Sequence, residues 1–145
     1  MILLDCGNSS AKAQYRADGR LAASFATRYS GDWGARLADW LQDRPASHCW
    51  LASVLDAGRR QTLESVLGAR FGDAVTRCRS EAECCGVING YDEPARLGVD
   101  RWLALLGAAA LIDGDWGEDE FLIVSPGQSI SPSNDPAILK AVPTA

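Results

Sequence analysis

The segment from Trp102 to Ile112 contains no charged side chain and, apart from Gly107, consists of good helix formers. Such a run predicts a buried helix rather than a surface one. It is too short for a membrane span, which takes about 20 apolar residues, because Asp113 ends it. Any fold of this chain therefore has to place this helix in the core of a globular domain.

Two charges, Asp100 and Arg101, precede that helix. Unpaired charges beside a dry element cost free energy, so both need partners, from the protein or from a ligand. One interpretation is structural, since an Asp at a helix N-terminus caps free N–H groups and complements the helix dipole. The other is functional, because only small residues follow on the Asp100 face and leave its carboxylate uncovered: Ala104, Gly107 and Ala108.

Composition limits the classes of partner. With 47% hydrophobic and 23% charged residues among 145, the chain is globular and of one domain's length. A net charge of −5 without a Lys/Arg cluster argues against nucleic acid. No basic region followed by an apolar stretch opens the chain, so neither a signal peptide nor a membrane partner is expected.

The five cysteines form an odd set without a C-x-x-C pair: Cys6, Cys49, Cys78, Cys84 and Cys85. This pattern predicts reduced thiols in a cytoplasmic protein rather than a disulfide framework. Together with the single His48, it gives no credible zinc site. The adjacent Cys84-Cys85 pair is interpreted as two small residues, because a disulfide between neighbours requires a strained ring.

The first 27 residues predict three antiparallel strands. An apolar run, Met1–Leu4, precedes a polar turn, and strand-like segments follow at 11–15 and 21–27. Asp18-Gly19 between these two segments is a strong hairpin signal.

The polar turn after the first strand carries groups that suit a nucleoside triphosphate. Asp5 can hold Mg²⁺ or its waters, the turn from Gly7 to Ser10 offers N–H and hydroxyl donors, and Lys12 supplies a cation. An ordinary polar turn is the alternative. The P-loop and Rossmann glycine motifs are both missing, so neither of those nucleotide sites competes.

The middle of the chain predicts amphipathic helices at 31–44 and 57–71, a strand at 49–55 and a weaker strand at 74–78; the segment 80–90 receives no assignment. Three strands followed by alternating helix and strand are typical of an α/β domain with a mixed sheet flanked by helices.

The segment 91–102 resembles the signature of a known family. Tyr91, Pro94, Leu97-Gly98 and Asp100-Arg101-Trp102 resemble the Y-x-x-P-x-x-L-G-x-D-R-W signature of type III pantothenate kinases, the family that includes Bvg accessory factors. The resemblance implies that Asp100 is the catalytic base that takes the proton from the pantothenate hydroxyl. It also implies a substrate pocket formed by Tyr91, Gly98, Val99, Asp100 and Arg101.

The turn after the first strand is similar to the first phosphate loop of the same family, D-x-G-N-[TS]-x-x-K. The resemblance implies that ATP contacts Asp5, Cys6, Gly7, Asn8, Ser9, Ser10, Ala11 and Lys12. It implies that Asp5 binds Mg²⁺, directly or through water. It also implies an actin-like, ribonuclease-H-like fold of the acetate and sugar kinase, Hsc70 and actin superfamily.

The resemblance weakens after residue 124. The family's second phosphate loop has an Asp that binds a monovalent cation, K⁺ or NH₄⁺, and a Thr that contacts ATP; Ser125 and Gln128 stand at those positions. We therefore expect a kinase domain over 1–124 and a Pro-rich irregular tail over 125–145 in place of a second domain. A truncation, a frameshift and a degenerate paralogue all remain open.

The implied function is ATP-dependent phosphorylation of pantothenate to 4'-phosphopantothenate, the first step of coenzyme A biosynthesis, in a cytoplasmic homodimer. Without the second domain, weak or no activity is expected from this chain. The alternatives are a non-catalytic nucleotide- or pantothenate-binding regulatory module and a folded fragment with exposed apolar surface.

Overall fold

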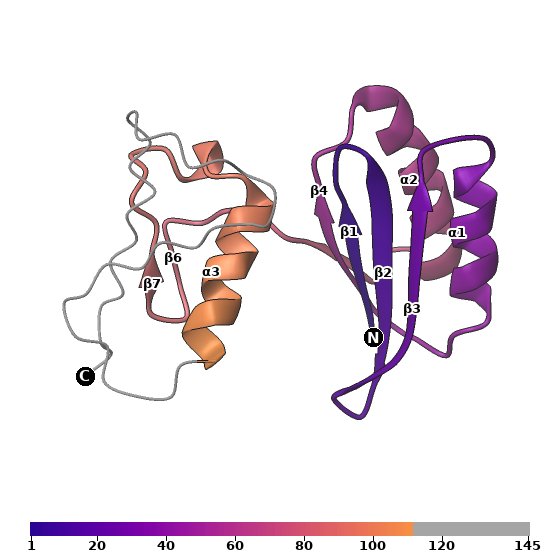
Figure 1. The fold of residues 1–145 in the computed structure, drawn as a ribbon, viewed down its shortest axis with the longest axis horizontal. Helices are drawn as coiled ribbons and strands as arrows, with labels where there is room; N and C mark the ends of the chain where they lie inside the picture. Colours follow the sequence, from indigo (N-terminus) through magenta and orange to yellow (C-terminus); the bar gives the residue numbers. More distant parts are fainter. Residues whose placement is uncertain (112–145) are drawn as a thin grey trace. The chain divides into compact units, whose positions relative to one another are not determined.

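The computed structural model describes residues 1–111, and the chain divides into two compact units, Met1–Cys78 and Arg79–Ala145 (Figure 1). Each unit is described by itself. The predicted boundary at residue 124 and the predicted tail lie outside the described residues, so both stay predictions. Within residues 1–111, no helix is long and apolar enough to cross a membrane.

The first unit is built on a five-stranded mixed sheet in the order β3-β2-β1-β4-β5. Its strands are β1 (Ile2–Cys6), β2 (Ser10–Ala17), β3 (Arg20–Arg28), β4 (Cys49–Ser53) and β5 (Val75–Arg77). The β1–β2 and β2–β3 pairs are antiparallel, whereas β4 runs parallel to both β1 and β5. The predicted mixed sheet and its three antiparallel opening strands are confirmed.

The turn between β2 and β3 has the backbone that its sequence predicts. Asp18 and Gly19 both have positive φ, 49° and 74°. Two such residues in succession form the hairpin turn whose twist matches the twist of the flanking strands.

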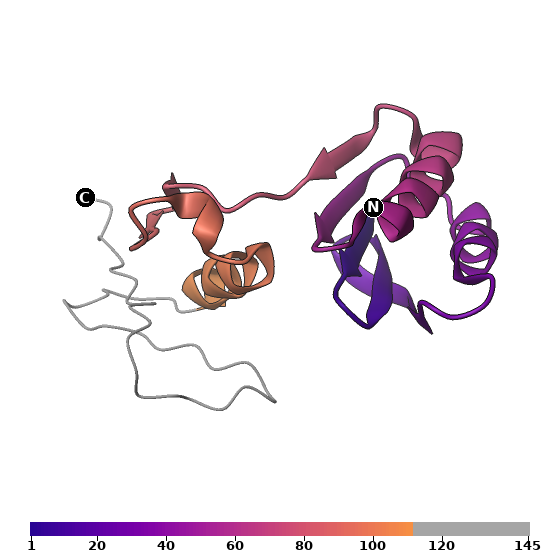
Figure 2. The same cartoon turned by 90° about the horizontal axis from the view of Figure 1, so that it is seen from above.

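Two helices cover one face of this sheet, α1 (Trp33–Gln42) and α2 (Ala57–Phe71) (Figure 2). Each begins after an Asp whose side chain caps the first turn: Asp32 accepts from the Ala35 N–H at 3.3 Å, and Asp56 accepts from the Arg59 N–H at 3.0 Å. These caps explain why α2 begins where the sequence predicts and why α1 begins two residues later than predicted.

Alternation along β1 separates the core from the polar face. Ile2, Leu4 and Cys6 are at most 3% exposed and pack in one cluster with the inward residues of both helices, Leu37, Leu41, Leu63 and Leu67. The residue between them, Asp5, is exposed on the other face of the strand. The helices approach closely at Gly34, where an added Cβ would lie 2.7 Å from the Thr62 methyl carbon.

In residues 79–111, the described part of the second unit, lie a short hairpin, a single turn of 3-10 helix and one α-helix. The hairpin consists of β6 (Glu83–Cys84) and β7 (Val87–Ile88); η1 (Pro94–Arg96) and α3 (Val99–Leu111) follow. A small core joins them: Val87, Leu97, Trp102 and Leu105. This hairpin was not predicted, because strands of two residues are too short to show alternation.

The prediction of a buried helix after Arg101 is confirmed for one side of α3 only, within the described residues. Trp102 and Leu105 are buried, but Ala104, Gly107 and Ala110 are exposed. The run is apolar on every side of the helix, so its pattern does not indicate which side packs. Tertiary contacts with the hairpin decide it.

All five cysteines are free, as predicted. The thiols of Cys84 and Cys85 lie 3.4 Å apart at the turn of the β6–β7 hairpin. Cys85 has a positive φ of 54°, which belongs to the turn.

Candidate nucleotide and substrate sites

Asp5 and Lys12 face each other across the first hairpin. Both side chains are exposed, and the two residues are direct partners in the β1–β2 register. Partners in an antiparallel pair lie on the same face with Cβ atoms about 4.5–5.5 Å apart. The sheet therefore presents a carboxylate and an ammonium on the same exposed face.

The turn between these strands is closed by a hydrogen bond from the Gly7 N–H to the Ser10 carbonyl at 3.1 Å. Asn8 and Ser9 are exposed at its tip. The side chains of Cys6 and Ala11, by contrast, are fully buried. Of the predicted ATP-binding residues, these two can therefore offer a ligand their backbone groups only.

Beneath the turn, the Cys6 thiol lies beside the Tyr29 side chain. The Tyr29 hydroxyl is buried and has no hydrogen-bond partner of good geometry in the described part of the chain; a thiol is a weak partner. Burial raises the pKa of Tyr29, with Cys6 and Asp5 adding to the shift. Burial likewise raises the pKa of the Cys6 thiol to about 12 and that of Cys49 to about 12.

These thiols predict a loss of stability at alkaline pH. Unfolded thiols ionise near pH 9.0, but the folded Cys6 and Cys49 thiols keep their protons to about pH 12. The unfolded state therefore loses protons first, and the free energy of unfolding falls as the pH rises above 9. We expect Cys6→Ala to reduce this fall by up to about 1.4 kcal/mol per pH unit. Urea unfolding between pH 8 and 10.5 measures it, with exposed Cys85→Ala as control; equal slopes for all three proteins would contradict the assignment.

In the second unit, Asn89 organises the segment that leads to the signature residues. Its buried side-chain amide donates to the carbonyls of Glu81 and Pro94 at 3.1 and 3.2 Å, and its Oδ1 accepts from the Tyr91 N–H at 3.1 Å. The Ser80 hydroxyl adds a bond to the Leu97 carbonyl at 2.6 Å. These polar contacts fix the chain on both sides of Tyr91.

We expect Asn89→Ala to destabilise the second unit by about 1–3 kcal/mol, because it removes three part-buried hydrogen bonds. Hydrogen exchange of the amides in 83–105 measures the local effect. Asn8→Ala, at an exposed turn, is the control and should change stability by less than about 0.5 kcal/mol. Unaltered exchange in Asn89→Ala would show that the segment holds its shape without this side chain.

Asp100 is exposed at the N-terminal turn of α3. Its carboxylate lies directly over Gly98, where an added Cβ would come 2.6 Å from Oδ1. Glycine at this position therefore lets the carboxylate keep its orientation. The other predicted substrate residues belong to the same segment, 91–101, and are half-buried: Tyr91, Gly98, Val99 and Arg101.

Gly98→Ala should force the Asp100 side chain into another rotamer, since a contact under 3.0 Å is not tolerated. For the pantothenate pocket that the resemblance implies, we expect the affinity for pantothenate to fall about tenfold while the melting temperature changes little. Calorimetric titration with pantothenate measures this. Gly107→Ala in the same helix, where nothing lies within 4 Å of the added carbon, serves as the matched control. Equal affinities in the two variants would mean that Gly98 has no such role.

The predicted site residues thus form two groups, each assembled within one unit. Asp5, the turn 7–10 and Lys12 belong to the first unit, and the segment 91–101 belongs to the second. Among residues 1–111, no group of three or more His, Cys, Asp or Glu side chains is arranged to hold a metal ion. The sequence did not single out Asn89, which joins the loop carbonyls around Tyr91, or Arg59, which contacts Asn8 from 51 positions away.

An Asp-bearing first strand, a polar hairpin turn and a Lys on the second strand of a mixed sheet define an α/β domain of the actin-like ATPase type. A profile described as type III pantothenate kinase matches residues 1–131. The chain belongs to the type III pantothenate kinase family.

Individual relatives agree with the profile. The chain is 42% identical over 111 residues to the type III pantothenate kinase of Pseudomonas savastanoi pv. phaseolicola, covering 74% of this chain and 44% of the relative. It is 37% identical over 109 residues to that of Alkalilimnicola ehrlichii, covering 74% and 43%. For the Burkholderia vietnamiensis enzyme the identity is 36% over 126 residues, covering 86% and 46%. The chain thus spans less than half the length of these curated relatives.

Proposed function

We propose that this chain carries the ATP loop and the pantothenate-binding segment of a pantothenate kinase. Such an enzyme transfers the γ-phosphate of ATP to pantothenate and gives 4'-phosphopantothenate. This reaction is the first step of coenzyme A biosynthesis. The observation that carries the proposal is the exposed Asp100 carboxylate, held over Gly98 within the family signature. A carboxylate sealed beneath other side chains would have had no access to an alcohol.

Asp100 acts as the general base. It accepts the proton of the primary hydroxyl of pantothenate as the hydroxyl oxygen attacks the γ-phosphorus in line, and ADP leaves. Tyr91, Gly98, Val99 and Arg101 bind and orient the substrate. Positioning supplies most of the rate in such transfers, because the protein forms no covalent bond with the phosphate.

The first unit binds ATP through 5–12, with Lys12 offsetting phosphate charge. Asp5 suits Mg²⁺, which is bound through one or two carboxylates together with substrate phosphates and waters, so one exposed carboxylate at a strand end fits. Bound Mg²⁺ would neutralise charge on the phosphate oxygens. The monovalent cation of the family, K⁺ or NH₄⁺, is proposed only for the intact enzyme. In this chain Ser125 replaces the Asp that would bind it, at a position outside the described residues.

The test uses the whole 145-residue chain. It is incubated with Mg²⁺, ATP and pantothenate, and 4'-phosphopantothenate is measured by mass spectrometry over hours, so that slow turnover is detected. Melting temperatures with each ligand are recorded in parallel; a ligand at 100 times its Kd adds about 2.7 kcal/mol of stability. Absence of product and of any ligand-induced shift would refute the proposal.

A second candidate function is a binding or regulatory module without turnover. It is favoured by one observation, the replacement of the second phosphate loop's Asp and Thr by Ser125 and Gln128. Ligand-induced melting shifts without product would support it. The homodimer and the cytoplasmic location expected from the family stay proposals, and sedimentation at several protein concentrations tests the former.

A further inference from the structure

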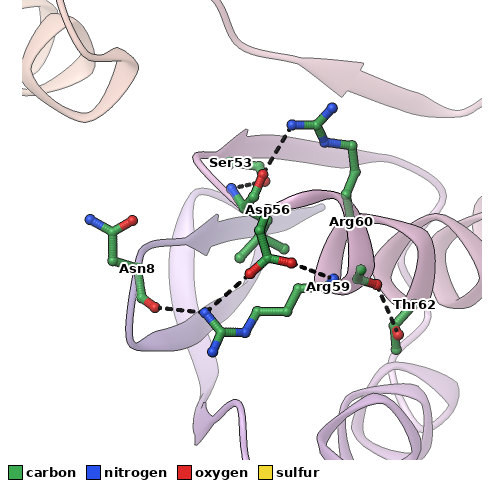
Figure 3. A network of polar contacts seen from close by, with 8 residues as sticks. Asn8, Ser53, Asp56, Arg59, Arg60 and Thr62 are labelled. Carbon is green, nitrogen blue, oxygen red and sulfur yellow. Dashed lines mark hydrogen bonds and ion pairs between the residues drawn. The ribbon is translucent and has the colours of Figure 1, made fainter.

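A guanidinium lies against the polar turn that follows β1, although no sequence motif marks it. Arg59, in the first turn of α2, donates from Nη1 to the backbone carbonyl of Asn8 at 3.2 Å (Figure 3). The two residues are 51 positions apart in the chain. Packing of α2 beside the first hairpin therefore brings this cation to the predicted phosphate loop.

Arg59 is held in place from two further directions. Its Nη1 lies 3.4 Å from Oδ2 of Asp56, and its guanidinium carbon lies 4.9 Å from the ring centroid of Tyr29. The Tyr29 ring packs edge-on against Trp33, with centroids 5.0 Å apart. A cation over a fixed aromatic face is attracted and oriented. The guanidinium is thus placed before a ligand arrives, which lowers the entropic cost of binding one.

Part of the hydrogen-bonding capacity of Arg59 is unused. Its contacts with Asn8 and Asp56 both employ Nη1, and within the described residues Nη2 and Nε donate to no acceptor. Asp56 only partly neutralises the Arg59 charge. The distance from Nη1 to Oδ2, 3.4 Å, exceeds the roughly 2.7–2.9 Å of a charge-assisted hydrogen bond. The Arg59 side chain is 42% exposed, so a ligand in solvent can reach it.

We propose that Arg59 is a phosphate-binding residue of the ATP site and contacts a phosphate oxygen of the nucleotide through Nη2 and Nε. The inference rests on the proposed function, in which the turn beside it binds ATP. A guanidinium is always charged, and its planar fork of N–H donors matches two phosphate oxygens. In a chain of net charge −5, a cation at this turn also offsets the general repulsion of an anion.

Calorimetric titration of ATP into the 145-residue chain tests the role of Arg59. We expect Arg59→Gln to raise the Kd about 10- to 100-fold, as the loss of a charge-assisted contact implies. The dependence of Kd on salt should also become weaker, because one ionic contact is removed. Arg59→Lys keeps the charge without the fork and should regain part of the affinity.

Arg60→Gln is the matched control, with the same change of charge at the next residue. The Arg60 guanidinium donates to the Leu55 carbonyl at 3.0 Å and points away from Asn8 (Figure 3). Its Kd should stay within about twofold of the unmodified chain. Melting temperatures without ligand check folding, and Arg59→Lys gives the answer if the Gln variant does not fold.

Three results would overturn the role of Arg59: unchanged ATP affinity in Arg59→Gln, an equal loss in Arg60→Gln, or a loss with unchanged salt dependence and no recovery in Arg59→Lys. The last of these would reduce Arg59 to a residue that only shapes the turn. If the unmodified chain binds no ATP, the proposed function itself fails. Unchanged ATP affinity in Arg59→Gln, with ATP bound by the unmodified chain, overturns the role of Arg59 alone.

Discussion

On the proposed function, we expect Asp100→Asn to lower the rate of 4'-phosphopantothenate formation by about 10²- to 10⁴-fold, the usual contribution of a general base. Asn has nearly the same shape as Asp but accepts no proton from the substrate hydroxyl. Because Asp100 is exposed at the first turn of α3, its replacement leaves the core intact. The rate is measured with saturating ATP and pantothenate, and ligand affinities are measured separately.

Asp92→Asn, an exposed carboxylate eight positions earlier in the same segment, controls for the loss of one negative charge. It should keep nearly the full rate. Equal rates for Asp100→Asn and the unmodified chain would remove Asp100 from the chemistry. A rate loss accompanied by an equal loss of pantothenate affinity would limit Asp100 to binding.

Leu37→Ala destabilises the first unit by about 2–5 kcal/mol, the range for truncating a large core side chain. Leu37 is fully buried where α1 packs on the sheet, in the same cluster as Ile2, Leu41 and Leu67. The truncation removes apolar contacts and leaves a cavity between helix and sheet. Since a domain is stable by about 5–15 kcal/mol in total, the loss is a large fraction of it.

Urea unfolding followed by far-UV circular dichroism measures the change, and Leu21→Ala provides the control. Leu21 is 54% exposed on β3, so its truncation should cost less than about 1 kcal/mol. If Leu37→Ala unfolds at the same urea concentration as Leu21→Ala, α1 does not pack on the sheet as the structure has it.

Much of the fold was predictable because its signals are local. An apolar run and two strand-like segments predicted the first three strands, Asp18-Gly19 predicted their hairpin, and amphipathic spacing predicted α2 with its observed bounds. Strand ends were less accurate: the predicted strand 49–55 ends at Ser53. The β6–β7 hairpin escaped prediction because its strands are only two residues long.

Some residues of the candidate site were predictable from the sequence and others were not. The positions of Asp5, Lys12 and Asp100 follow from short motifs, and the register that sets Asp5 opposite Lys12 follows from the length of the turn between them. Asn89 did not show in the sequence, because its role depends on carbonyls that only the folded loop brings near.

By itself, the sequence determined the strands of the first hairpins, the start of α2 and the family, since each depends on patterns within short stretches of chain. Only the tertiary structure decided which side of α3 is buried and that Arg59 lies against Asn8. Such contacts join segments far apart in the chain, and they arise from the packing of whole elements against a shared core rather than from any local preference.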